Sequence, residues 1–218
     1  MKKSLFLALC LIAFSSLRLM AETIPATDTR ITYVGRTAVE GTSVSFDWTA
    51  TYFRITFSGQ SLTMKASDTK RNYYNVWIDS PTSAEPHRVI AVAGNDTVIE
   101  LVDPTFLKKS RRAVHEVIVQ KRTEGEQGTT TIHEFTTLKG TFSASTPLAE
   151  RQLEFIGDSY TCGYGIDAKS RLEKFTPETE NASRSYAAIV SRYFGADYVA
   201  IAHSGMGIAR NYNSKFKN

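Results

Sequence analysis

From Arg30 to about Phe142 the sequence alternates between apolar and polar residues, and this alternation constrains the fold more than any other feature. A period of two places every second side chain on the same face of an extended strand, so each run can bury one face. Such runs lie at 44–48, 53–57, 62–64, 74–78, 89–92, 98–102, 114–119 and 132–138. Turn-forming clusters separate the runs, and no convincing helical stripe interrupts them. About eight strands of this kind predict two antiparallel sheets packed face to face, as in an all-β sandwich or jelly roll.

The periodicity changes after Pro147, where we place a domain boundary. A short apolar strand at 153–156 is followed by a helical stripe at 186–193 and by a continuous apolar run at 198–202. Strand, helix and continuous strand in this order predict a βαβ unit whose strands are buried on both faces. We therefore expect residues 148–218 to begin an α/β domain.

The first 21 residues have the layout of a secretory signal peptide. Two lysines precede an apolar run at 5–14, and a small residue, Ala21, ends the segment. The run is too short to span a bilayer, and no later segment has the roughly 18 uninterrupted apolar residues that a transmembrane helix needs. We expect a secreted or periplasmic protein with no transmembrane segment and with its β-sandwich domain at 22–147.

The basic character of the chain comes mainly from the predicted signal peptide. The whole sequence has 26 Lys and Arg against 22 Asp and Glu, a net charge of +4. Residues 1–21 hold three basic residues and no acidic ones, so the remainder has a net charge of only +1. This near balance does not favour nucleic acid as a partner.

The sharpest chemical signal is Gly157-Asp158-Ser159, directly after the predicted strand at 153–156. A serine just beyond the carboxyl end of a buried strand lies on the edge where α/β sheets bind ligands. The peptide N–H of Ser159 is placed there to face developing oxyanion charge. The alternative is an ordinary strand-to-loop turn, because Gly-Asp-Ser favours turns. The Gly-x-Ser-x-Gly elbow of the α/β-hydrolases is absent, since Thr161 stands in place of its second glycine.

A second signal, His203-Ser204-Gly205-Met206-Gly207, follows the predicted strand at 198–202. Parallel strands of a βαβ unit end on the same edge of the sheet, so this segment should approach Ser159. A glycine in this position presents an unobstructed N–H, which would be the second donor that a tetrahedral oxyanion needs. The alternative is a flexible loop.

In their order and residue identities these two segments resemble the conserved blocks of the SGNH, or GDSL-like, hydrolases, of which the first is Gly-Asp-Ser and the second is Ser-Gly. More specifically, the chain is similar to carbohydrate esterase family 2, whose members join an N-terminal jelly roll to an SGNH hydrolase domain with a flavodoxin-like, three-layer fold. The closer resemblance covers nearly all of the chain after the signal segment and rests on Tyr33-Val34-Gly35-Arg36, Tyr73-Tyr74-Asn75-Val76, Lys121-Arg122-Thr123-Glu124 and the stretch from Glu154 to Gly165.

The resemblance implies a serine esterase that removes acetyl groups from plant polysaccharides such as xylan or glucomannan, without a cofactor. It makes Ser159 the nucleophile that carries the acyl group, with its own N–H as one oxyanion donor. Gly205 supplies the second donor, a role that Gly207 fits less well. The expected partner is an acetylated polysaccharide or oligosaccharide.

The residues after Ser159 lack the acid/base partner of the family. Only 59 residues follow it, and they contain neither Gly-x-Asn-Asp nor Asp-x-x-His. We therefore expect the catalytic histidine beyond residue 218 and an incomplete α/β domain, with a sheet edge and an apolar helix face uncovered. His203 is the only histidine of this half; it is either an alternative base or a strand-end residue that is packed or half solvated.

Other candidate residues have a structural interpretation beside the chemical one. Cys162 is either a reactive thiol or, as we expect, a small packed neighbour of Ser159; it has no partner for an intramolecular disulfide, because Cys10 lies in the signal segment. Tyr73, Tyr74 and Trp77 either stack on sugar or, for most of them, pack within the sandwich. The four histidines have no metal-ligand spacing, and no metal is predicted.

Two other functions remain open from the sequence. One is a non-catalytic carbohydrate-binding protein, in which the jelly roll holds a glycan and the α/β segment is inert. The other is a lipase-like SGNH enzyme, which is disfavoured because nothing in the sequence supplies a long apolar groove for an acyl chain. Acetate release separates the esterase from the binding protein.

Overall fold

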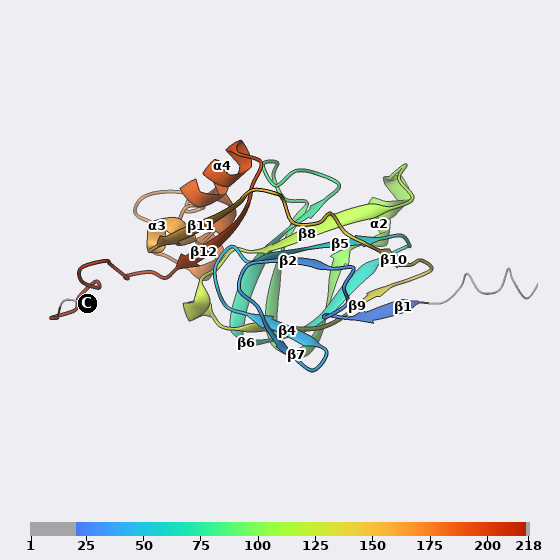
Figure 1. Cartoon of the computed structure of the whole chain (residues 1–218), viewed down its shortest axis with the longest axis horizontal. Coiled ribbons are helices and arrows are strands. Elements are labelled where there is room, and N and C mark those ends of the chain that lie inside the picture. The colour runs from blue at the N-terminus through green and yellow to red at the C-terminus, as the bar shows by residue number, and fades with distance from the viewer. Residues whose placement is uncertain (1–20, 217–218) are drawn as a thin grey trace, which may run out of the picture.

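The computed structural model describes residues 21–216, in which a large curled β-sheet is followed by a small parallel β–α–β unit (Figure 1). The curled sheet contains β1 (Glu22–Pro25), β2 (Thr32–Val34), β3 (Ala38–Glu40), β4 (Ser43–Phe46), β5 (Tyr52–Phe57), β6 (Leu62–Ile78), β7 (Arg88–Val102), β8 (His115–Lys121), β9 (Thr130–Thr137) and β10 (Phe142–Ser143). The unit that follows contains β11 (Gln152–Gly157), α3 (Ser159–Cys162), α4 (Tyr186–Tyr193) and β12 (Asp197–Ala202). The predicted signal peptide falls almost wholly on residues 1–20, which lie outside the described residues.

The curled sheet is one continuous hydrogen-bonded sheet, whereas the alternation predicts two. Its strands follow the order β10-β5-β8-β6-β9-β4-β3, with β1 on β9, β2 on β5 and β7 on β6. The long strand β6 makes the sheet continuous, because residues 62–68 pair with β9 and residues 74–78 pair with β8. Register irregularities against β7 between Ala66 and Arg71 allow β6 to bend there. The two predicted sheets are therefore not separate, because β6 joins their strands into one sheet that curls over its own core.

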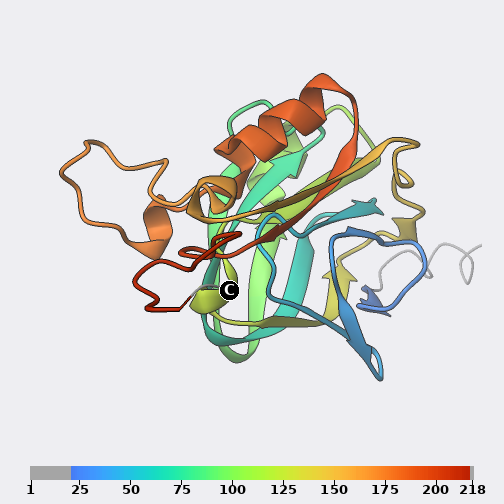
Figure 2. The same ribbon diagram turned by 60° about the vertical axis from the view of Figure 1, so that its left-hand side comes forward.

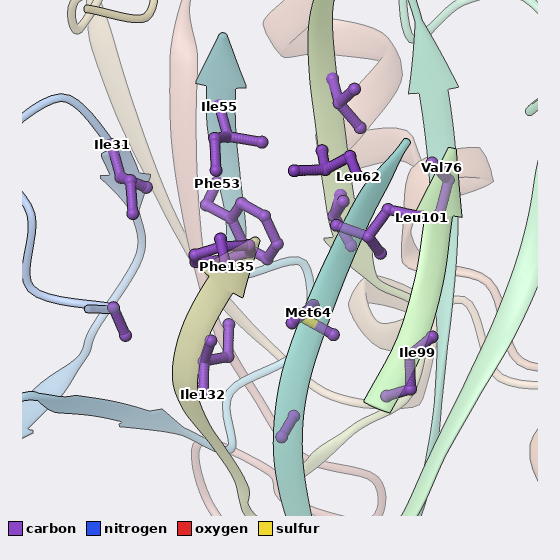
Figure 3. Close-up of a cluster of buried hydrophobic side chains, with 14 of the residues drawn as sticks. Ile31, Phe53, Ile55, Leu62, Met64, Val76, Ile99, Leu101, Ile132 and Phe135 are labelled. Carbon is purple, nitrogen blue, oxygen red and sulfur yellow. The ribbon is translucent and has the colours of Figure 1, made fainter. Parts of the chain in front are cut away.

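The core fills the inside of this curl, as the alternation predicts. In β5, Phe53, Ile55 and Phe57 are each at most 1% exposed, while the residues between them are only partly buried. Figure 3 shows Phe53 and Ile55 in one cluster with side chains of β6, β7 and β9. Phe53 packs edge-on against Phe135 of β9, with ring centroids 5.2 Å apart. Burial of one face per strand therefore holds the curled sheet together.

A short helix, which the alternation does not predict, interrupts the β structure at α2 (Pro104–Lys109). Asp103 caps its start by accepting hydrogen bonds from the N–H groups of Thr105 and Phe106 at 2.7 and 2.9 Å. Proline in the first turn and two lysines in the last also favour a helix here. The remaining short helices are 3₁₀ turns at Gly125–Gln127, Pro177–Thr179 and Ala182–Arg184.

The β–α–β unit has the predicted parallel pairing. β11 and β12 run side by side from the pair Gln152–Asp197 to the pair Gly157–Ala202, so both strands end at the same edge. The expectation that both strands are buried on both faces is wrong for β11, whose alternate residues are exposed, Ile156 to 79%. The predicted uncovered helix face is confirmed, because α4 buries its alanines and leaves the apolar residues Tyr186, Ile189, Val190 and Tyr193 open.

The β–α–β unit packs against the outside of the curled sheet, as two views of the molecule show (Figure 1, Figure 2). A second apolar cluster joins Val34, Ala50 and Tyr52 of the curled sheet to residues of α4 and β12. Within it, Gln120 of β8 donates a hydrogen bond to the hydroxyl of Tyr198 at 3.0 Å. Among the described residues, no helix has the length and apolar character needed to cross a membrane.

Candidate active site

A pocket of about 680 Å³ opens at the edge where β11 and β12 end. Ser159 lines it from the turn after β11, and Gly205 lines it from the turn after β12. Glu126, in the 3₁₀ turn that follows β8, contributes a wall from the curled sheet. The structure therefore brings together the two segments that the sequence selects.

The local backbone presents Ser159 at this edge because its neighbours permit a tight turn. A Cβ on Gly157 would lie 2.1 Å from Oγ1 of Thr161, so a side chain there would clash. Asp158 caps α3 by accepting a hydrogen bond from the N–H of Tyr160 at 3.0 Å. Gly163 ends the helix in the left-handed conformation, with φ of +75°. Ser159 is thereby held half-buried as the first residue of α3.

The two candidate glycines differ in what their amides already bind. The N–H of Gly207 donates to Oδ1 of Asn211 at 3.1 Å. Gly205 has a φ of +80°, and its carbonyl accepts a hydrogen bond from the N–H of Tyr212 at 2.7 Å. Within residues 21–216 we find no acceptor for the N–H of Gly205, which leaves it available as a donor in the pocket. The geometry thus favours Gly205 over Gly207 as an oxyanion donor.

The two ring nitrogens of His203 contact groups other than Ser159. Its Nδ1 lies 2.9 Å from the carbonyl of Ser204, and its Nε2 lies 3.5 Å from a carboxylate oxygen of Glu126. The side chain is 32% exposed. In the described part of the chain, no imidazole contacts the hydroxyl of Ser159. The alternative in which His203 acts as the base is therefore not favoured by this arrangement.

Two buried carboxyl groups lie beside the pocket, and the sequence analysis assigned neither of them a role. Glu124 and Glu180 are both 0% exposed. Oε2 of Glu180 accepts a hydrogen bond from the N–H of Glu124 at 3.1 Å, and Oε2 of Glu124 accepts one from the N–H of Ser204 at 2.6 Å. Burial, together with the nearby Glu124 carboxyl, raises the pKa of Glu180 to about 8. Glu180 therefore keeps its proton at neutral pH.

Cys162 completes a small buried cluster with these two carboxyls. The ligand atoms of Glu124, Cys162 and Glu180 lie within 4.8 Å of one another, a spacing that also suits a metal ion. However, burial raises the pKa of the Cys162 thiol, so the sulfur stays protonated and is a poor ligand. One oxygen of Glu124 is also already used by Ser204. These three side chains therefore suit a protonated, hydrogen-bonded cluster better than a metal site.

Three aromatic residues considered for sugar stacking are instead part of the interior. Tyr74 and Trp77 are each 1% exposed, and the indole N–H of Trp77 donates to the carbonyl of Ala84 at 2.9 Å. The hydroxyl of Tyr73 donates to Glu178. The aromatic wall of the pocket consists of Tyr164 and Tyr212, which the sequence analysis did not select. Tyr164 is stacked on Phe175, with ring centroids 3.6 Å apart.

Comparison with known proteins places the chain among carbohydrate esterases. The family model described as carbohydrate esterase 2 N-terminal matches residues 33–147. A curated acetylxylan esterase / glucomannan deacetylase from Cellvibrio japonicus is 33% identical over 187 residues, which are 82% of this chain and 48% of that relative.

Solved structures give the same relationship. A family two carbohydrate esterase from Clostridium thermocellum, in complex with cellohexaose, superposes with a TM-score of 0.76 and 29% identity over 85% of this chain and 55% of its own. A carbohydrate esterase whose active site is described as displaying "divergent catalytic and non-catalytic binding functions" has a TM-score of 0.67 and 28% identity over 89% of this chain and 54% of its own. The chain thus spans about half the length of these relatives.

Proposed function

Because this chain belongs to carbohydrate esterase family 2, we propose that its Ser159 pocket removes acetyl groups from plant polysaccharides such as xylan or glucomannan. One observation carries the proposal: a single pocket is lined by Ser159 and Gly205 from the ends of two neighbouring parallel strands. The similarity to an acetylxylan esterase / glucomannan deacetylase supports the substrate class.

In the proposed reaction, Oγ of Ser159 attacks the acetyl carbonyl and its proton passes to a histidine base. The N–H groups of Ser159 and Gly205 donate hydrogen bonds to the oxyanion that forms, and each donor of this kind is typically worth about 3 kcal/mol of barrier. The C–O bond to the sugar then breaks, and the sugar oxygen takes the proton from the histidine. Water, deprotonated by the same base, releases acetate from the acyl-enzyme.

The histidine base of this proposal lies in sequence beyond residue 218. Two observations support this part of the proposal. His203 is occupied by Glu126 and by the carbonyl of Ser204, and the relatives are about twice as long as the matched region. We further propose that the curled sheet is the jelly-roll domain, at 22–147, and that the β–α–β unit begins an SGNH hydrolase domain. We also propose secretion or export to the periplasm, which the predicted signal peptide supports.

Acetylation of Ser159 tests the proposed nucleophile directly. When the 218-residue chain is incubated with an aryl acetate, we expect an acetyl group on Ser159, detected by peptide mass spectrometry. Without the base, acylation by an activated ester relies on the oxyanion donors of the pocket, and the acyl-enzyme is hydrolysed slowly, so the adduct should accumulate on Ser159. In the Ser159→Ala variant this adduct should be absent.

Exposed Ser83 is the internal control for non-specific acetylation. Preferential acetylation of Ser159 supports the proposal. Equal acetylation of the two serines would contradict it, because the pocket would then give Ser159 no advantage over a serine in solvent.

A second candidate function is glycan binding without turnover. It is favoured by the similarity to an esterase whose active site has "divergent catalytic and non-catalytic binding functions" and by the exposed aromatic wall of Tyr164 and Tyr212. Binding of a xylan or glucomannan oligosaccharide that is lost in Tyr212→Ala, with no acetylation of Ser159, would select this function. Calorimetric titration provides the measurement.

A further inference from the structure

We propose that Glu124 is a positioning residue of the proposed esterase site, an inference that rests on the proposed function. Its buried carboxylate reaches from the curled sheet to the turn after β12 and fixes the amide of Gly205 in the pocket. No step of the proposed reaction uses Glu124 itself, so its role is to hold groups that do.

The first support is the hydrogen bond between Glu124 and the residue that directly precedes Gly205. Oε2 of Glu124 accepts from the N–H of Ser204 at 2.6 Å, and the two residues are 80 positions apart in the chain. This N–H···O distance is short for a hydrogen bond from a backbone amide. On the other side, the N–H of Tyr212 donates to the carbonyl of Gly205 at 2.7 Å. The Gly205 amide is thereby fixed from both sides.

The second support is that the same oxygen also contacts the helix that carries Ser159. The thiol of Cys162 lies 3.7 Å from Oε2 of Glu124, and Cys162 is the last residue of α3, which Ser159 begins. One carboxyl oxygen therefore contacts both segments that carry the candidate residues, α3 at Cys162 and the turn after β12 at Ser204. Such a contact sets the spacing between the nucleophile and the second oxyanion donor, and small errors in that spacing are costly for catalysis.

The third support is that the backbone of Glu124 is held in place by hydrogen bonds. The ammonium of Lys121 donates to the carbonyls of Thr123 and Glu124 at 2.7 and 3.0 Å, and the N–H of Glu124 donates to Glu180. Glu124 is 0% exposed, and in the described residues its Oε1 has no hydrogen-bond partner. Burying a carboxyl group costs free energy unless the group is hydrogen-bonded, and here the N–H of Ser204 supplies a hydrogen bond.

The test combines amide hydrogen exchange with the rate of Ser159 acetylation. In Glu124→Gln we expect the amide of Ser204 to exchange about 10-fold faster, because an amide oxygen, a weaker acceptor, replaces the carboxyl oxygen that binds this N–H. We expect acetylation by a saturating aryl acetate to slow by about 10-fold to 100-fold, with little change in the half-saturating ester concentration. If the substitution only destabilised the fold, amide exchange would instead become faster throughout β5 and β8.

Glu116→Gln is the matched control. Oε2 of Glu116 likewise accepts a backbone N–H from a distant segment, that of Thr146 at 2.8 Å, but outside the Ser159 pocket. This variant should leave exchange at Ser204 and acetylation of Ser159 unchanged. If Glu124→Gln fails to fold, Glu124→Asp, which keeps the carboxyl group but shortens the side chain, should show the same two effects.

The outcomes distinguish failure of the positioning role of Glu124 from failure of the proposed esterase function. Unchanged exchange at Ser204 in the Glu124 variant overturns the positioning role, as does faster exchange with an unchanged acetylation rate. Absence of acetylation in the unmodified chain would count against the esterase, and the positioning role is then judged at the amide of Gly205. An unchanged Gly205 amide shift and exchange rate in the variant would overturn it.

Discussion

Replacing Asp197 by alanine is expected to lower the free energy of unfolding by about 3–5 kcal/mol. Asp197 begins β12 and forms an ion pair with Arg54 of β5, whose side chain is only 12% exposed. The hydroxyl of Tyr52 donates to the same carboxylate at 2.5 Å, and the N–H of Ala149 donates to it at 2.8 Å. Without the carboxylate, a largely buried guanidinium loses its counter-ion and two further donors lose their acceptor.

Urea unfolding of the unmodified chain and the variant measures this loss. Arg36→Ala is the matched control, because the Arg36–Glu154 ion pair also joins the curled sheet to β11. This pair is exposed: the two side chains are 60% and 53% accessible to solvent. Exposed pairs contribute roughly 0–1 kcal/mol, so the control should be nearly neutral. Similar losses in both variants would show that burial of the Arg54–Asp197 pair is not what stabilises the contact.

The pH dependence of this contact has a defined sign. Burial alone would raise the pKa of Asp197, but hydrogen bonds from Arg54 and Tyr52 outweigh burial and hold it below its ordinary value. A carboxyl whose pKa is lower in the folded state stabilises the fold above its unfolded pKa, and this contribution is lost as the pH falls. The difference between the unmodified chain and Asp197→Ala should therefore shrink in acid.

The parts of the fold that the sequence predicts are those set by local periodicity. The period of two identifies the inward residues of β5, and the apolar run at 198–202 identifies β12. The merging of the predicted strands into one sheet depends on β6, which pairs with three different strands and has polar residues at its centre. Pairing over such distances leaves no periodic signal, so the alternation predicts two strands, at 62–64 and 74–78, where the structure has the single strand β6.

The candidate site shows the same division. Ser159 and Gly205 are recognisable because a short motif follows each strand, and parallel strands end at one edge. Glu124 and Glu180 are not, because charged residues are by default exposed, and only the folded structure reveals that these two are buried together. Lys121-Arg122-Thr123-Glu124 attracted notice as a resemblance to the family, without any residue of it receiving a role.

The chain is expected to lose stability as the pH rises from about 4.5 to about 8, because of Glu180. Its side chain is buried, and burial with the neighbouring Glu124 raises its pKa from 4.5 to about 8. In this range the folded state binds a proton that the unfolded state has released, so stability falls with pH by up to about 1.4 kcal/mol per unit. Lys121 acts in the opposite sense at higher pH, because burial lowers its pKa from 10.5 to about 8.

Glu180→Gln separates this effect from the rest of the pH dependence. Glutamine resembles the protonated carboxyl, so the variant should match the unmodified chain at pH 5 and be more stable than it at pH 8, by several kcal/mol if the full shift is expressed. Urea unfolding at the two pH values measures the difference, with exposed Glu150→Gln as the control that should keep the original slope. An equal decline in Glu180→Gln would show that another group carries the proton. If the stability of Glu180→Gln does not change between pH 5 and pH 8, loss of the Glu180 proton is what limits the stability of the unmodified chain near neutral pH.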